Sequence, residues 1–246
     1  MIFTEEKLQS LPSRHRANLI NNCCGIRSGN LIGSVDKDLR ENLAIFNSVM
    51  HLGSDPALIG FILRPLTVER HTYANIHQTK FFSINQIPKD LYKEAHQTSA
   101  KYNKNESEFE TCGIEKEYLK DYSIPFVKSS KVKIACAYEN EYPIKENGCV
   151  MIVGKIEMIA IEDIALSEDL WINHERLNSI GIGGLDTYYS VTCLDRLSYA
   201  QAHKESKSIY GSQKTTSWPK NMPHLSTPVS MAQEMGEKLG KRQILF

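Results

Sequence analysis

The sequence predicts a mainly β protein, an antiparallel β-barrel with a few helices and a C-terminal extension. Short strand-like runs separated by turn residues fill most of the chain from residue 17 to about residue 161. The run 57–63 is apolar throughout and lies between two prolines, which is typical of a strand covered on both faces. The runs 132–138 and 150–158 alternate apolar and polar side chains. This period of two favours strands over helices.

The first quarter of the chain is expected to hold four strands. A Ser-Gly-Asn turn at 28–30 and an Asp-Lys-Asp turn at 36–38 divide it into segments of strand length. The expected strands are 18–26, 31–35, 41–50 and 57–63. Their close spacing indicates antiparallel hairpins.

The middle of the chain changes to a helical period. Apolar and aromatic residues recur at helical spacing over 71–78, and Thr72 is the expected N-cap of that helix. A strand returns at 81–84. Pro88 is expected to open a second helix that reaches about Tyr102, because proline suits the first helical turn. A short helix is expected near Phe109.

Two features mark the last third of the chain. Gly154 interrupts an alternating strand, which indicates a β-bulge or a close backbone approach. Residues 205–246 are polar and poor in core residues, with a short helix expected after Thr227. We therefore expect a domain over 1–204 and a C-terminal extension over 205–246 that packs on the domain or on a partner subunit.

The charge balance argues against one class of function. The chain has 29 Lys and Arg against 29 Asp and Glu, a formal net charge of zero. A duplex-binding protein needs a surplus of basic residues, so we expect no nucleic-acid partner. No apolar run approaches the roughly 20 residues that span a bilayer, and the N-terminus lacks the pattern of a signal peptide. We therefore expect a cytoplasmic protein that does not associate with membranes.

The cysteines and histidines do not predict a metal centre. The six cysteines include no C-x-x-C, and the histidines show neither H-x-x-x-H nor H-x-x-E-H spacing. We expect no metal, and the sequence singles out no catalytic residue.

The segment 64–76 carries the first candidate binding signal. It places Arg64 and Arg70 before the helix expected at 71–78, with Thr72 and Asn75 on one helix face. A helix N-terminus offers unpaired N–H groups and a partial positive charge, which suit a phosphate. The alternative is a well-capped surface helix with solvated arginines. On spacing alone that alternative is favoured, because caps are common and phosphate sites are rare.

The segment 42–51 carries the second candidate signal. Asn47 and Ser48 interrupt a strand that is otherwise apolar on both faces. Such an interruption can expose backbone groups to the edge of a planar ligand. The alternative is a bulge in which Asn47 and Ser48 bond locally, and the segment by itself favours that alternative.

Taken together, these segments resemble a known family. In chain order they read N-L-A-I-F-N-S at 42–48, D-P-A-L-I-G-F at 55–61, R-H-T-Y-A-N-I at 70–76, F-F-S-I-N at 81–85, M-I-V-G-K-I-E at 151–157 and G-G-L-D-T-Y-Y at 183–189. This order resembles the flavin reductase-like, FMN-binding split-barrel family, including the flavoredoxin group. The resemblance covers about residues 15–200 and implies an antiparallel split β-barrel.

The resemblance also implies which residues bind FMN. The segment that contacts the phosphate and the ribityl chain corresponds to Arg70, Thr72 and Asn75. The strand whose backbone borders the flavin ring corresponds to Phe46, Asn47 and Ser48. Arg64 and Asn85 complete the cofactor-binding set.

The function implied by the resemblance is that of an FMN-dependent oxidoreductase. Electrons would pass from NAD(P)H through the flavin to a small-molecule or protein acceptor, and the protein would be a homodimer with the flavin near the interface. Two alternatives stay open. One is a non-catalytic FMN-binding or electron-transfer module. The other is a flavin-free barrel that serves in subunit interaction.

Overall fold

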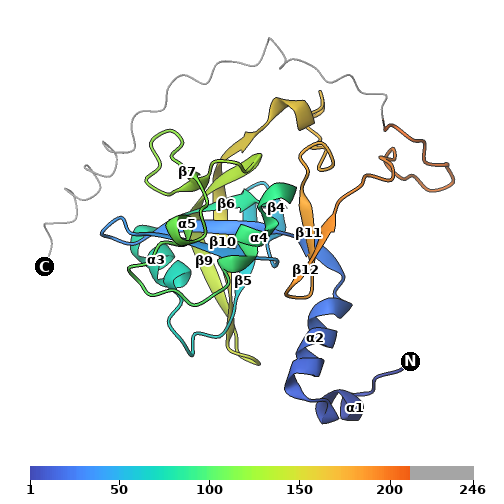
Figure 1. Ribbon diagram of the computed structural model, residues 1–246. Helices are drawn as coiled ribbons and strands as arrows, with labels where there is room; N and C mark the ends of the chain where they lie inside the picture. The colour runs from blue at the N-terminus through green and yellow to red at the C-terminus, as the bar shows by residue number, and fades with distance from the viewer. Residues whose placement is uncertain (211–246) are drawn as a thin grey trace, which may run out of the picture.

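Within residues 1–210, which the computed structural model describes, an antiparallel sheet of seven strands forms the body of the protein (Figure 1). The strand order is β3-β2-β6-β9-β10-β5-β4. The bounds are β2 (Asn30–Val35), β3 (Glu41–Phe46), β4 (Met50–Ser54), β5 (Ala57–Leu63), β6 (Phe81–Gln86), β9 (Val132–Ile144) and β10 (Cys149–Ile161). The predicted mainly β fold is confirmed.

The sheet is an open, or split, barrel. Its two edge strands, β3 and β4, are consecutive in the chain, with residues 47–49 between them, and no ladder pairs one with the other. The strand predicted at 41–50 therefore divides at this corner. Gly154 lies at a bulge in the pairing of β10 with β9, as expected. A side chain there would clash with the Phe82 ring, 2.5 Å from an added Cβ.

Two layers of apolar side chains cover the sheet. Inside the barrel, Ile32, Phe61, Phe82 and Ile152 are fully buried together with Ile76 of helix α3 (His71–Thr79). No residue of β5 is exposed, which agrees with its apolar sequence.

The outer face of β2 and β3 is covered by a second layer. Its elements are η1 (Lys89–Leu91), α4 (Tyr92–Gln97), α5 (Glu108–Thr111) and β11 (Ile180–Gly183). The helix expected from Pro88 to Tyr102 is thus shorter than predicted. Its first turn is a 3-10 turn, and α4 ends at Gln97.

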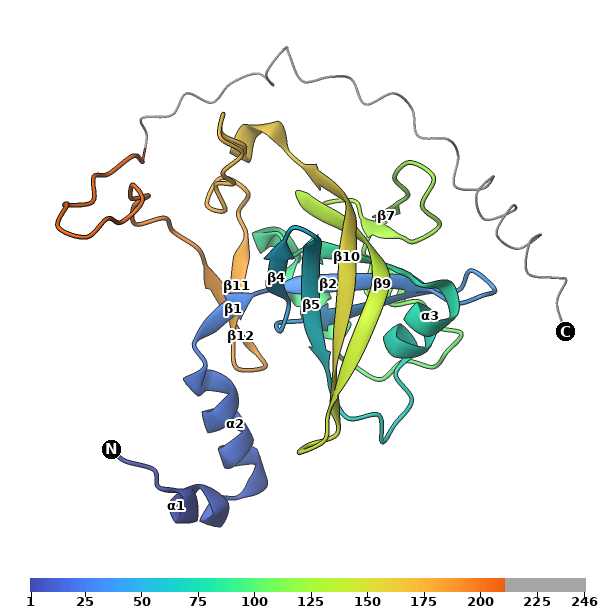
Figure 2. The same ribbon diagram turned by 180° about the vertical axis from the view of Figure 1, so that it is seen from behind.

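A small sheet and two helices lie beside the barrel (Figures 1 and 2). Strands β1 (Ile26–Ser28), β11 and β12 (Thr187–Ser190) form this sheet, and β7 (Lys116–Glu117) pairs with β8 (Phe126–Val127) elsewhere. Helices α1 (Glu5–Ser10) and α2 (Ser13–Cys23) extend away from the barrel and bury no residue.

The prediction of a strand over 18–26 was wrong for most of that range. Residues 18–23 belong to α2, and β1 covers three residues after it. The run Asn-Leu-Ile-Asn-Asn is too short for its period to separate helix from strand, and the helix also includes the polar residues before it.

The C-terminal part is described up to residue 210. After β10 the chain forms the 3-10 turn η2 (Asp163–Ala165). Residues 196–209 form a loop in which an isolated antiparallel β-bridge pairs Leu197 with Ser208. The boundary expected at 204/205 falls inside that loop and stays a prediction. The helix expected after Thr227 lies outside the described residues. No helix in the described part is long and apolar enough to cross a membrane.

Candidate functional site

The N-terminus of α3 presents unpaired donors. The first intrahelical bond runs from Ala74 N to the Arg70 carbonyl, so the N–H groups of residues 71–73 have no acceptor within the helix. Arg70 is the N-cap, yet its side chain makes no capping bond. Its Nε atom is buried and has no hydrogen-bond partner among the described residues. This helix end is therefore suited to an anion.

Thr72 does not cap the helix, contrary to the sequence prediction. It is the second helical residue and is buried, and its Oγ1 accepts a hydrogen bond from Asn42 Nδ2 at 3.0 Å. Asn75 is also buried and donates to Ser34 Oγ at 3.3 Å. Both side chains fix α3 to β2 and β3. Because these side chains already have protein partners, the groups of the first turn that are available to a ligand are its backbone N–H groups.

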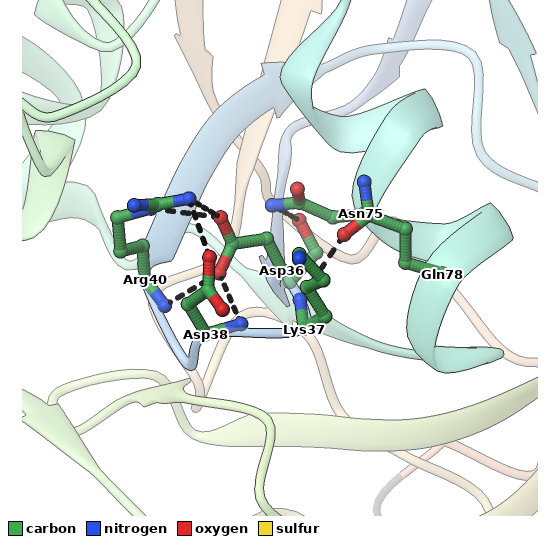
Figure 3. Close-up of polar contacts among 7 residues, drawn as sticks. Asp36, Lys37, Asp38, Arg40, Asn75 and Gln78 are labelled. Carbon is green, nitrogen blue, oxygen red and sulfur yellow. Dashed lines mark hydrogen bonds and ion pairs between the residues drawn. The ribbon is translucent and has the colours of Figure 1, made fainter.

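The turn between β2 and β3 supports the same helix (Figure 3). Lys37 N donates to Gln78 Oε1 at 3.1 Å, which ties the turn to the last turn of α3. Asp36 is buried and accepts bonds from the N–H groups of Asp38 and Arg40 and from the Arg40 guanidinium. Burial acts to raise the pKa of Asp36, but these donors outweigh it and lower the pKa below the usual value.

A small, open recess lies between this turn and the start of α3. Arg40, His71 and Lys104 line it together with the carboxylates of Glu41 and Glu106. The recess therefore carries charges of both signs. In the described part of the chain, no group of three Cys, His, Asp or Glu side chains is arranged to hold a metal.

The corner between β3 and β4 forms the second part of the site. Ser48 Oγ accepts from Ile62 N at 3.1 Å and donates to the Ile62 carbonyl at 3.2 Å. Asn47 Nδ2 donates to the Gly184 carbonyl at 2.7 Å. The Phe46 ring packs edge-on against Phe61, with centroids 5.0 Å apart. These contacts fix the corner to β5 and to the β11–β12 turn.

The free edge of β3 leads from one part of the site to the other. Leu43 N points away from β2 and donates to the buried carboxylate of Glu108 at 2.9 Å. Because strand groups alternate, Ile45 N points away from β2 in the same direction, along the edge of β3 that pairs with no other strand. Asn42 and Phe46 lie four residues apart on this strand, about 14 Å by the usual rise. An elongated ligand could follow the edge from the helix end to the corner.

Two of the predicted site residues lie apart from these groups. Arg64 is exposed at the start of the loop that follows β5. Asn85 is completely buried, and its amide bonds the Leu31 carbonyl, Ser83 Oγ and Val127 N. The geometry of Asn85 is that of a core residue, because protein groups occupy both ends of its amide.

Three residues that hold the elements of the site in place were missed by the sequence reasoning: Asn42, which bonds Thr72; Glu108, which bonds Leu43 N; and Glu141, which bonds Tyr73 of α3. Asn42 was part of the N-L-A-I-F-N-S segment, and its polar side chain at the start of a strand was an available signal. Glu108 and Glu141 meet their partners across 65 and 68 residues of chain. No local pattern points to such pairs.

The fold and the site define a class: a split β-barrel with free donors at a helix N-terminus and an open strand edge beside it. The chain belongs to the flavin reductase like domain family, which matches residues 25–181, more than half of its length. The predicted family membership is confirmed.

Solved structures show the same architecture. A split-barrel protein from Shewanella frigidimarina NCIMB 400, assigned as a flavin reductase, is 42% identical with a TM-score of 0.79, covering 81% of this chain and all of its own. Nitrilotriacetate monooxygenase component B from Bacillus cereus is 19% identical, with a TM-score of 0.71 and coverages of 80% and 98%. Flavoredoxin of Desulfovibrio vulgaris (Miyazaki F) is 18% identical, with a TM-score of 0.61 and coverages of 73% and 92%. The last two support the fold alone.

Proposed function

We propose that the protein is an FMN-dependent oxidoreductase that passes reducing equivalents from NAD(P)H to a small-molecule or protein acceptor. The observation that carries the proposal is the buried, unpartnered Nε of Arg70 beside the free N–H groups of residues 71–73. A buried donor without a partner costs free energy, and a phosphate oxygen would satisfy it. Family membership supports a flavin as the molecule that carries this phosphate.

The described residues fit FMN in two further respects. The Ile45 N–H lies on the edge of β3 that pairs with no other strand, and in this proposal it would donate to the polar edge of a flavin ring. Asn47 and Ser48 are held by Gly184 and Ile62, so the corner keeps its shape without a ligand. In this proposal Arg70 binds the phosphate, and Thr72 and Asn75 hold the helix in place.

The protein supplies binding and orientation, and FMN, when bound, supplies the redox chemistry. Arg70 and the first turn of α3 would fix one end of the cofactor. The β3–β4 corner would hold the other end of the cofactor. No side chain is required as an acid or base. Arg64, exposed at the start of the loop after β5, has no fixed role in this proposal.

A binding titration tests the phosphate assignment. We expect the protein to bind FMN at least tenfold more tightly than riboflavin, because riboflavin lacks the phosphate. Fluorescence quenching of each flavin measures both constants. Equal dissociation constants for FMN and riboflavin would show that the protein does not contact the phosphate. Binding of neither flavin would favour a flavin-free barrel.

A reduction assay separates the oxidoreductase from a passive flavin carrier. Under anaerobic conditions, NADH or NADPH should bleach the visible absorption of the bound flavin. A loaded protein that neither nucleotide bleaches would be a non-catalytic FMN-binding or electron-transfer module. The cytoplasmic location expected from the sequence stays a prediction.

We also propose that the protein is a homodimer. Helices of 6 and 11 residues are marginal in water without packing, yet α1 and α2 bury no residue. Exposed Ile26 and Tyr189 lie over the glycines of β11 next to α2. A second copy would cover this surface. Sedimentation should give a dimer that Ile26→Asp weakens, and a monomeric wild-type protein would contradict the proposal.

A further inference from the structure

A second cluster of polar side chains holds the opposite face of α3. Tyr73 OH donates to Glu141 Oε1 at 3.0 Å, and His77 Nε2 lies 2.9 Å from Glu141 Oε2. Tyr73 and His77 are one helical turn apart, so both project from one face. Glu141 belongs to β9, across the barrel from the strand that holds Thr72. One carboxylate thus binds two side chains of the helix.

Aromatic packing makes this contact well ordered. The Tyr73 and His77 rings lie 4.3 Å apart, and His77 lies 5.1 Å from the Tyr138 ring. Lys80 Nζ sits 4.7 Å from the centre of the Tyr138 ring. Burial, and then the hydrogen bond to Glu141, raise the pKa of Tyr73, so its hydroxyl stays a donor.

We propose that Glu141 is a positioning residue for the phosphate end of the cofactor site, acting through Tyr73; this inference rests on the proposed binding of FMN. Two consecutive residues of the first turn are fixed to different strands. Thr72 bonds Asn42 of β3, and Tyr73 bonds Glu141 of β9. The N–H groups of these two residues are two of the three that have no acceptor in the helix. With both side chains held, the direction of these N–H groups is set before a ligand arrives.

This arrangement lowers the cost of binding. Ordering a loose helix turn on binding would consume part of the affinity, whereas a turn fixed in advance avoids that loss. The Glu141 carboxylate itself does not face the anion as a free charge, because Tyr73 and His77 occupy both of its oxygens. Glu141 is thus expected to help the binding of a phosphate despite its own negative charge.

The experiment compares FMN and riboflavin affinities in four single variants and in the double variant that combines Tyr73→Phe with Glu141→Ala. Glu141→Ala removes the anchor, and Glu141→Gln keeps an acceptor for Tyr73 while removing the charge. Tyr73→Phe removes the donor alone. Glu157→Ala is the matched control, since Glu157 accepts a bond from Tyr122 OH at 3.4 Å on the neighbouring strand, far from α3 in sequence. Circular dichroism confirms folding of each variant.

The expected result is a loss of selectivity and not of flavin binding in general. Glu141→Ala should weaken FMN by roughly tenfold, the size of an ordinary indirect coupling, and change riboflavin by less than about twofold. Glu141→Gln should restore most of the loss. Tyr73→Phe combined with Glu141→Ala should be no worse than Glu141→Ala alone, because both act through one contact. Glu157→Ala should leave the selectivity of the wild type.

Other outcomes overturn the proposal. Unchanged FMN selectivity in Glu141→Ala, or an equal loss for both flavins, would make Glu141 merely structural. Tighter FMN binding in Glu141→Gln would show that its charge repels the phosphate. Fully additive effects of the two substitutions would show that Glu141 does not act through Tyr73. If the wild type itself fails to prefer FMN, the phosphate assignment fails first, and that result is distinct from the others.

Discussion

Helices α2 and α3 differ in where their polar side chains find partners. In α2, Asn21 and Asn22 donate to the carbonyls of Ala17 and Asn18 in the same helix. In α3, the corresponding amide of Asn75 donates to Ser34 of β2. No residue of α2 is buried, whereas α3 buries three. The asparagine side chains of α2 therefore bond within their own helix, whereas the Asn75 side chain of α3 joins its helix to the sheet.

This difference explains why a binding site forms at one helix end and not at the other. Both helices have a cap residue whose side chain makes no capping bond. The first turn of α3 is held from two sides, by Asn42 and by Glu141, so its free N–H groups have a fixed direction. At the start of α2, Arg16 donates to the carbonyls of Gln9 and Leu11, which lie in the preceding N-terminal segment and not in the sheet. A helix end becomes useful to a ligand when packing has already fixed it.

The largest expected effect is on stability. Ile76 of α3 is fully buried, and Ile76→Ala should lower the free energy of unfolding by about 2–5 kcal/mol. Ile20 of α2 is 46% exposed within one chain, so Ile20→Ala should cost less than Ile76→Ala, and its cost should depend on protein concentration because only the proposed dimer covers this side chain. Urea unfolding of both variants at two protein concentrations gives the comparison. An effect of Ile20→Ala below about 0.5 kcal/mol at every concentration would count against a dimer that covers α2.

The next effect concerns affinity. Arg70→Ala removes a donor to the proposed phosphate and should weaken FMN by roughly 10- to 100-fold, from about 1.5–3 kcal/mol for a hydrogen bond to a charged group. Riboflavin should change little. Arg14 in the first turn of α2 provides the control, because it is exposed and Arg14→Ala should alter neither constant. Equal losses of FMN affinity in both variants would indicate a general effect of charge.

The contrast between the helices also shows what sequence reasoning could reach. The strands at 31–35, 57–63 and 81–84 were predicted because short apolar runs and the turn residues or prolines beside them are local signals. The prediction that Thr72 caps α3 was wrong because the Thr72 hydroxyl bonds Asn42, which lies 30 residues away in the chain and is not visible in the local sequence. Helix α2 was missed because its pattern is short and it gains no packing that would mark an apolar face. Partners set by strand register, such as Glu141, depend on the assembled barrel.

A smaller effect is expected at the contact that replaces the predicted cap. Thr72→Val keeps the shape of the side chain but leaves Asn42 Nδ2 with a long bond to Ser34, and should cost about 1–3 kcal/mol of stability. Thr72→Ser keeps the hydroxyl and should recover most of it. Asn21→Ala in α2 is the matched change, with an expected effect within about 0.5 kcal/mol. Thermal unfolding measures the stability of all three variants. If Thr72→Val left the stability unchanged, the bond between Thr72 and Asn42 would not help to hold α3 in place.

The smallest expected effect is a pH dependence at Glu108, which lies beside His71 at the start of α3. Burial raises the pKa of Glu108 above its usual 4.5, against the opposing hydrogen bonds from Leu43 N and its own N–H and the attraction of His71. The folded state thus holds the proton more tightly than the unfolded state. The contribution of Glu108 to the free energy of unfolding is therefore fully present below pH 4.5. It is lost as the pH rises through the raised pKa of Glu108.

Glu108→Gln tests this sign. Glutamine can accept from Leu43 N without a charge to desolvate, so the variant should gain stability relative to the wild type as the pH rises above 4.5, by about 1 kcal/mol or less. Thermal unfolding of both proteins at several pH values gives the difference. Glu110→Gln, one residue beyond Phe109 on the exposed side of α5, is the control and should show no such trend. A difference that instead falls with rising pH would mean that the carboxylate is stabilised by its donors more than burial opposes it, and the start of α3 would then lie beside a permanently charged group.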